Sequence, residues 1–427
     1  MGGFLKRLGL ETPAQRAWAM YDWGNSAFIT VIVTAIFPIY YQTVVAADLE
    51  PAQATARFSY VTSGALVLVA LLSPLLGALA DARAWRKRFL TVWLLIGVLA
   101  TAAMAWVGEG DGPLGLTLFA IGNVAVLLSI VFNDSLLPHI AREEQVDRLS
   151  AAGYALGYLG GGLLLAVNLV LYLQPETFGL ADAGVAIRVG FVLTAIWWFV
   201  FSLPVLRKVP EPPAEDASAS AGLGDALRRL ASTLSQLRRY RQAFLLLVAV
   251  LVYNDGVSTI YRLATIYGTE IGLPQSSLIT AILLVQFVGV PFAFLFGSLA
   301  ARIGTKRAIL IGLSVYLVIS VFGYFVTTST HFFIMAILVA MVQGGVQSLS
   351  RSLFASMIPP EKSSEFFGFF GVAERFAAVL GPLVFGYVTA MTGSSRYAVV
   401  SVVVFFLVGG ALLLKVDVDE GVRVARS

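Results

Sequence analysis

The chain has 427 residues, of which 58% are hydrophobic and only 13% are charged, and its mean hydropathy is +0.84. Soluble domains carry about 25% charged residues, so this composition excludes a water-soluble globular protein. The formal net charge is +4, which we interpret as a signal of membrane orientation rather than of binding to nucleic acid.

Twelve apolar segments follow one another along the chain, and a bilayer-spanning helix needs about 20 such residues. They lie near 17–46, 57–80, 89–107, 113–137, 150–173, 186–205, 242–269, 277–300, 308–326, 332–357, 366–391 and 397–414. The first segment is too long for the apolar region of a cleavable leader, so we expect none. The predicted fold class is an all-α membrane protein with twelve transmembrane helices.

A polar interval divides the spans into two sets of six. We predict an N-terminal six-helix bundle at 1–205, a cytoplasmic linker at 206–241 and a C-terminal six-helix bundle at 242–427. The first part of the linker, 209–222, is rich in Pro, acidic residues, Ser and Ala, which is typical of a flexible segment. Leucines then recur at helical spacing beside arginines, which favours either an amphipathic helix on the anionic leaflet or a solvated helical linker. These leucines are Leu223, Leu227, Leu230, Leu234 and Leu237.

The basic residues are distributed unequally between the two sides of the predicted spans. One side receives 24 of the 29 lysines and arginines, and the other receives only Arg57, Arg188 and Arg396. Because positively charged loops stay in the cytoplasm, both termini are predicted to be cytoplasmic.

No residue pattern points to catalysis. The chain has no cysteine, and its two histidines, His139 and His331, fall on opposite sides of the predicted membrane, so they cannot hold one metal ion. The phosphate-cradling, HExxH and nucleophile-elbow motifs are absent from the sequence. We therefore predict that the chain is not an enzyme and needs no cofactor.

Two sequence echoes relate the halves. "GALADARAWRKR" at 77–88 resembles "GSLAARIGTKR" at 297–307, with Arg86 aligned to Lys306 and Lys87 aligned to Arg307. "YDWGNS" at 21–26 resembles "YNDGVS" at 253–258. Two six-span halves related in this way are typical of transporters whose substrate site lies between the halves near the membrane midplane.

"GALADARAWRKR" also resembles the loop motif between the second and third helices of the major facilitator superfamily, with Asp81 as its acidic residue. The sequence departs from that motif at Trp85, and the second copy has Ala301 in place of the acid. "YDWGNSAF", "YNDGVSTIY", "SAAGYALGYLGGG" and "GGVQSLSRSLFASMIPPEKSSEFFGFFG" resemble the branch that contains the autophagy-associated vacuolar amino-acid effluxers and their bacterial permease relatives. The resemblance implies two pseudo-symmetric six-helix bundles of the major facilitator fold, in the inner (plasma) membrane of a bacterium.

Charged residues inside the spans mark the predicted substrate or coupling site, because a charge at the centre of a membrane helix costs about 2.5–3.5 kcal/mol. Asp255 lies near mid-bilayer, and Arg262 follows on the same helix face but two turns away, too far for a close ion pair. Asp255 could carry a proton, bind the ammonium group of a substrate or belong to a structural ion network. The full set of candidates is Asn25, Tyr253, Asn254, Asp255, Arg262 and Arg375.

A second set of polar residues lies near the predicted cytoplasmic ends of the helices. We expect Asp81 to stabilise the outward-open state, while Asp134 and Arg351 occupy equivalent helix ends, where they either latch the halves or act independently. The candidate gating residues are Asp22, Asp81, Arg86, Asp134 and Arg351.

These patterns predict a secondary active transporter that exports a small polar solute, an amino acid or a related metabolite, by alternating access. One alternative is a proton- or cation-coupled importer of sugars or other metabolites, with Asp255 as the coupling acid. Another is a transporter-like receptor or scaffold that no longer cycles. The expected partners are a small-molecule substrate, membrane lipids and, in the coupled alternative, protons. No nucleic-acid partner is expected, and the chain is predicted to act as a monomer.

Overall fold

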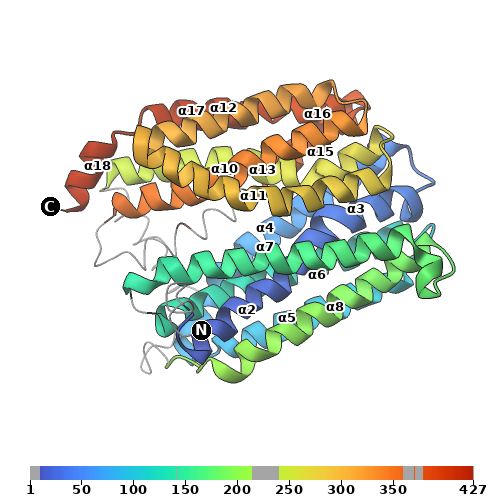
Figure 1. Ribbon diagram of the computed structural model, residues 1–427, viewed down its shortest axis with the longest axis horizontal. Coiled ribbons are helices and arrows are strands. Elements are labelled where there is room, and N and C mark those ends of the chain that lie inside the picture. Colours follow the sequence, from blue (N-terminus) through green and yellow to red (C-terminus); the bar gives the residue numbers. More distant parts are fainter. Residues whose placement is uncertain (1–9, 142, 214–239, 359–369, 371–377, 427) are drawn as a thin grey trace. The chain divides into compact units, whose positions relative to one another are not determined.

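The computed structural model of the chain describes residues 10–141, 143–213, 240–358, 370 and 378–426, and these residues form helices and connecting turns without any strand (Figure 1). Ten apolar helical stretches within this part are long enough to cross a membrane. Two shorter apolar stretches, Gln275–Gly289 and Leu380–Thr392, lie at the positions of the eighth and eleventh predicted spans. The all-helical membrane fold predicted from hydropathy is therefore confirmed.

The chain divides into two units, Met1–Leu49 with Leu71–Leu223, and Glu50–Ala70 with Gly224–Ser427. The long helix α4 (Pro51–Arg83) belongs to both units, because its first turns pack with residues of the second half of the chain. Hydropathy alone could not reveal that α4 is shared between the two units. The predicted linker helix at 223–237 lies outside the described residues.

Within the first unit, α2 packs against α7 and α8, and α5 packs against α6 and α8. The bounds are α2 (Pro13–Ala27), α3 (Phe37–Tyr40), α5 (Arg86–Ala103), α6 (Gly112–Ile140), α7 (Glu143–Leu173) and α8 (Ala183–Lys208), with the short 3₁₀ turns η3 (Met104–Trp106) and η4 (Pro175–Phe178). Gly153, Gly157 and Gly161 of α7 lie against Asp22 and Ser26 of α2 and against Thr30 just beyond it. A side chain at any of these glycines would meet α2 atoms, so the stripe lets the two backbones approach closely.

The first membrane-crossing stretch begins as an α-helix at the residues that its sequence indicates, and its helical turns then become wider. Thr12 is the N-cap of α2, and it forms a capping box with Gln15, followed by Pro13 in the first turn. The helix continues into two π-helical segments, η1 (Phe28–Ile36) and η2 (Tyr41–Val45), which flank α3. The Thr34 hydroxyl donates a hydrogen bond to the carbonyl of Ile29, five residues earlier, at 2.9 Å. The predicted first span is therefore helical throughout, and its second half contains two segments of π-helical geometry.

Within the second unit, α11 and α12 pack against α13, and α10 packs against α17 and α15. The bounds are α10 (Arg241–Glu270), α11 (Gln275–Ile303), α12 (Thr305–Tyr324), α13 (Ser329–Ser356), α15 (Leu380–Thr392), α16 (Ser395–Ser401), α17 (Val403–Leu414) and α18 (Val418–Ala425). The helix α15 begins after a turn at Ala378 and Val379, in the middle of the predicted eleventh span. That start positions the candidate site described below.

The repeat seen in the sequence has a structural counterpart in each unit. Lys87, in the first turn of α5, donates to the carbonyl of Val209 just after α8, at 2.6 Å. Lys306, in the first turn of α12, donates to the carbonyls of Leu414, the last residue of α17, and of Val416, at 2.9 and 2.7 Å. Each lysine thus satisfies carbonyls at the end of the last long helix of its own unit. By role, Lys87 corresponds to Lys306, one residue away from the alignment predicted from the sequence.

Candidate functional site

The centre of the candidate site is Asp255 on α10, which is only 1% exposed. Its Oδ1 accepts a hydrogen bond from the backbone N–H of Gly381 at 2.8 Å, and the N–H of Leu380 interacts with the same carboxylate. Gly381 and Leu380 are the first two residues of α15. A carboxylate at this position satisfies backbone donors that have no partner within the helix and stabilises its positive end.

The contact between α10 and α15 depends on a glycine. A Cβ at Gly381 would collide with the Thr259 hydroxyl and would lie 2.7 Å from Oδ1 of Asp255. Thr259 in turn donates to the backbone carbonyl of Asp255 at 2.7 Å. Because Gly381 has no side chain, the α15 backbone comes close enough for its N–H to reach the carboxylate.

The first turns of α4 also contact α15 and the residue that precedes it. The Ser63 hydroxyl donates to the carbonyl of Val379 at 2.7 Å, while Gly386 of α15 lies against Ser59 and Tyr60. The first two residues of α15 therefore bind α10 through their N–H groups. The residue before them, Val379, binds α4 through its carbonyl.

Arg262 is a second buried charge on α10, with 5% of its surface exposed. Within the described part of the chain, its Nε and Nη1 atoms have no hydrogen-bond partner, so the Asp255 carboxylate does not satisfy them. The guanidinium carbon lies 5.3 Å from the centroid of the Tyr261 ring. A guanidinium attracted to the face of an aromatic ring in this way still has its in-plane N–H donors available for another group.

Next to Arg262, α10 carries a half-buried polar stripe made of Asn254, Ser258 and Tyr261. These residues are spaced by four and three, so they share one helix face. The structure records no hydrogen bond for their side chains among the residues it describes. Tyr253 lies elsewhere on the helix, since its hydroxyl pairs with the Ser350 hydroxyl of α13 and Gly409 of α17 packs against its backbone.

The candidates on α2 are bound to their own helix and to α7. Asn25 is 4% exposed, and its Nδ2 donates to the carbonyl of Tyr21 at 3.0 Å and to the Asp22 carboxylate at 3.2 Å. The half-buried Asp22 lies against Gly153 of α7. The structure thus brings Asn25 and Asp22 together within the first unit.

The remaining gating candidates are scattered among the helix ends. Arg86 is buried and lies 3.0 Å from Nε2 of His139, Asp134 is exposed on α6, and Arg351 is half-buried on α13. The Asp81 side chain and the whole of Arg375 lie outside the described residues.

Sequence reasoning missed Glu270, the last residue of α10. One carboxylate oxygen accepts from the Thr55 hydroxyl of α4, and the other accepts from the N–H of Ser395, the first residue of α16, at 2.8 Å. Glu270 therefore joins three helices of its unit. An acidic residue directly at the end of an apolar span, before "IGLP", was the available signal.

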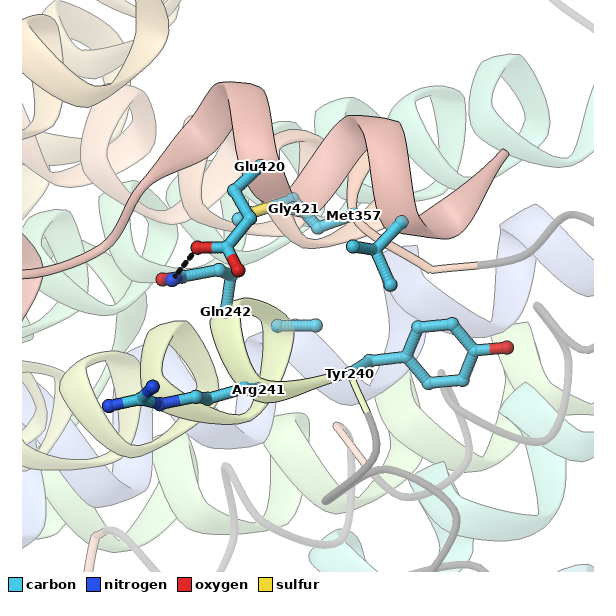
Figure 2. Close-up of a pocket in the computed structure, with 8 residues that line it drawn as sticks. Tyr240, Arg241, Gln242, Met357, Glu420 and Gly421 are labelled. Atoms are coloured by element: carbon cyan, nitrogen blue, oxygen red, sulfur yellow. Dashed lines mark hydrogen bonds between the residues drawn. The ribbon is translucent and has the colours of Figure 1, made fainter. Parts of the chain in front are cut away.

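Sequence reasoning also missed the C-terminal helix α18, which lines a small pocket with the start of α10 and the end of α13 (Figure 2). Gln242 spans this contact: its Nε2 donates to the Glu420 carboxylate, and its Oε1 accepts from the N–H of Asp417 at 2.9 Å. Met357 packs on Gly421 in the same place. The pocket lies at the ends of these helices, far along α10 from Asp255.

Comparison with known proteins supplies the family. The family model described as vacuole effluxer Atg22 like matches residues 12–426. The uncharacterized MFS-type transporter YxiO of Bacillus subtilis is 33% identical over 418 residues, which cover 97% of each chain. Autophagy-related protein 22-1 of Aspergillus niger is 26% identical over 305 residues, 66% of this chain and 48% of the fungal one. The match thus spans about half the length of that fungal relative.

Solved structures show the same fold. The nucleoside transporter NupG superposes with a TM-score of 0.69 at 14% identity, covering 94% of this chain and 99% of NupG. The xylose transporter XylE from E. coli superposes with a TM-score of 0.66 at 15% identity, covering 93% and 94%. The chain therefore has the all-α major facilitator fold and is a multi-pass integral membrane protein. It is a transporter rather than an enzyme. It belongs to the Atg22-like effluxer family of the major facilitator superfamily.

Proposed function

We propose that the chain exports an amino acid or a closely related small metabolite by alternating access. The observation that carries this proposal is the match of an effluxer family model to residues 12–426, nearly the whole chain. Both termini are cytoplasmic in this proposal, as the distribution of basic residues indicates.

The buried polar groups of α10 support a substrate site in the second unit. A transport helix needs polar side chains at membrane depth, and such residues are costly unless they serve binding or transport. Arg262 and the Asn254, Ser258 and Tyr261 stripe supply such groups, while Asp255 already has backbone partners. Asn25 and Arg375 remain candidates in the same proposal, with Asp22, Asp81, Arg86, Asp134 and Arg351 as gating groups.

The rival function is coupled import of a sugar, with Asp255 as the coupling acid. The likeness to XylE shows the fold alone and does not favour that substrate. The hydrogen bond from Gly381 gives Asp255 a structural role that needs no proton transfer.

The test is equilibrium exchange in proteoliposomes that contain the purified full-length chain. Vesicles are offered a labelled panel of amino acids, neutral sugars and nucleosides, with protein-free vesicles as the control. Faster equilibration of at least one amino acid, without acceleration of the sugars, is expected. Acceleration of sugars alone would replace the proposal with the rival function.

A further inference from the structure

We propose that Arg262, together with Tyr261, Asn254 and Ser258, binds the carboxylate group of the transported solute. This inference rests on the proposed transport function and narrows its substrate to solutes that carry a carboxylate. Amino acids and simple organic acids fall within that class, whereas neutral sugars and nucleosides do not.

The first argument is the incomplete hydrogen bonding of Arg262. A guanidinium is always charged and carries five N–H donors and no acceptor. Arg262 is 5% exposed, and two of its nitrogen atoms, Nε and Nη1, have no partner among the described residues. Burying a charged group without partners is strongly unfavourable, so an anionic ligand would satisfy donors that the described residues leave unused.

The second argument is the position of the guanidinium. Its carbon lies 5.3 Å from the centre of the Tyr261 ring, which belongs to the half-buried face of α10. Asn254 and Ser258 share that face and add an amide and a hydroxyl. Polar side chains of this kind within a span face protein or a water-filled path rather than lipid. A solute reaching this face would therefore meet one cation and several neutral hydrogen-bonding groups.

The third argument concerns the sign of the charge. Asp255, the buried acid of α10, has its carboxylate directed to the N–H groups of α15. Arg262, Tyr261, Asn254 and Ser258 bring one positive charge and no acid of their own, and Asp255, two turns from Arg262 on its side of α10, is already hydrogen-bonded to α15. A planar guanidinium pairs well with a carboxylate through two parallel hydrogen bonds. One guanidinium matches the single charge of a carboxylate better than the double charge of a phosphate ester.

The test uses matched compounds and the native full-length chain. Exchange of the amino acid that the vesicles accept is measured against three competitors of one skeleton, such as leucine, leucinol and 4-methylpentanoate. Leucinol keeps the ammonium group and lacks the carboxylate, while 4-methylpentanoate keeps the carboxylate and lacks the ammonium group. Losing the carboxylate is expected to weaken competition by about 10- to 100-fold, the usual effect of a lost hydrogen bond to a charged group. Losing the ammonium group is expected to weaken it less.

Variants then assign that effect to Arg262. Arg262→Lys keeps the charge but loses the planar pair of donors, so it should reduce the preference for leucine over leucinol, and Arg262→Gln should abolish it. Tyr261→Phe keeps the ring beneath the guanidinium and removes only the hydroxyl. Arg396→Lys is the matched control, because Arg396 donates to the carbonyl of Tyr324 at 2.7 Å and should leave the preference unchanged.

The outcomes separate this inference from the proposed function. Exchange of an organic acid but of no amino acid, lost in Arg262→Gln, would support the carboxylate site and refute amino-acid export. Exchange of amino acids with equal competition by leucinol would leave amino-acid export standing and overturn the carboxylate site. Competition by inorganic phosphate but not by carboxylates, or exchange of neutral sugars alone, would also overturn it. If Arg262→Gln fails to fold, the comparison of leucine with leucinol on the native chain still tests recognition of the carboxylate, and Arg262→Lys tests its assignment to Arg262.

Discussion

Asp255 and Arg262 are two buried charges of opposite sign on one helix, and their neighbours differ. Asp255 accepts hydrogen bonds at the start of α15, whereas two nitrogen atoms of Arg262 have no partner in the described part of the chain. A buried charged group whose hydrogen bonds are all made can serve the structure alone. A buried charged group with unused donors is costly, and a bound ligand can supply the missing partners. At the residue scale, we therefore assign structure to Asp255 and recognition to Arg262.

The structural role of Asp255 predicts a difference between two substitutions. In Asp255→Asn the amide oxygen can still accept from Gly381, because asparagine is as good a helix cap as aspartate. In Asp255→Ala the N–H groups of α15 lose their acceptor, at a cost of about 1–3 kcal/mol. We expect Asp255→Asn to keep the thermal midpoint and exchange activity close to native, and Asp255→Ala to lower both. Equal loss of exchange in the two variants, with the thermal midpoint of Asp255→Asn unchanged, would instead favour a titrating carboxylate.

The sequence revealed which residues were unusual at this scale but not what they contact. Asp255 and Arg262 stand out because charges are rare within spans. The partner of Asp255 is a backbone N–H 126 positions away, brought close by a glycine, and no local pattern encodes that distance. Tyr253 and Asn254 are adjacent in the same motif, yet only Asn254 lies on the half-buried polar stripe.

At the scale of elements, the two lysines that follow the repeated loops hold helix ends in place. Lys87 contacts the residue after α8, and Lys306 contacts residues around the end of α17. The shared role explains why the motif keeps a basic residue in both halves, although the acid at Asp81 has no counterpart at Ala301.

The shared role predicts similar effects of Lys87→Met and Lys306→Met. Each substitution removes a cation from C-terminal carbonyls, and we expect a loss of about 1 kcal/mol in the free energy of unfolding. The thermal midpoints of the purified variants check this expectation, with the exposed Lys208→Met as control. A loss in Lys87→Met without one in Lys306→Met would contradict the structural equivalence.

The helix α18 depends on Gln242, which bonds to Glu420 (Figure 2) and also accepts a hydrogen bond from the N–H of Asp417. Gln242→Ala removes both bonds and should release the helix. A cysteine placed at Ala425, which is 7% exposed, should then react with a water-soluble maleimide several-fold faster. Arg241→Ala is the control, because the Arg241 side chain is exposed. An unchanged rate in the Gln242→Ala background would show that Met357 and Gly421 suffice to hold α18.

Long apolar elements were predictable, and short or irregular ones were not. The twelve spans follow from hydropathy, and the start of α2 follows from the Thr12 and Pro13 pair. The eight residues of α18 follow the last apolar span and are not apolar on average, so a search for apolar spans does not detect them. The π-helical segments η1 and η2 also escape prediction, because a change from a four- to a five-residue hydrogen-bond step leaves the apolar composition unchanged.

At the scale of the whole molecule, the distribution of basic residues predicts the orientation. The chain has no cysteine, so a single one introduced as Glu215→Cys, in the predicted cytoplasmic linker, reports on one site. We expect an impermeant maleimide to label it in inside-out membrane vesicles and not in intact cells. Arg188→Cys, on the predicted outer side, should show the reverse. Labelling of the linker from outside would refute the orientation.

Sequence motifs predicted the family, and the fold of the whole molecule followed from the spans and from the two echoes, one of which is the loop motif, at corresponding places in the halves. They did not predict that residues 51–70, the first part of α4, group with the second unit. That grouping depends on Ser63, Ser59 and Thr55 meeting α15 and Glu270, which are contacts between small polar side chains without a distinctive pattern.

Counterflow is the measurement that tests transport by alternating access most directly. Proteoliposomes loaded with an excess of an unlabelled amino acid are diluted into a trace of the same labelled compound. A carrier that exchanges one molecule at a time predicts transient accumulation of label above its equilibrium level, and this accumulation should be weaker in Arg262→Gln. Monotonic filling would indicate a channel, and no filling beyond protein-free vesicles for any amino acid or organic acid would contradict the transport function proposed for this chain.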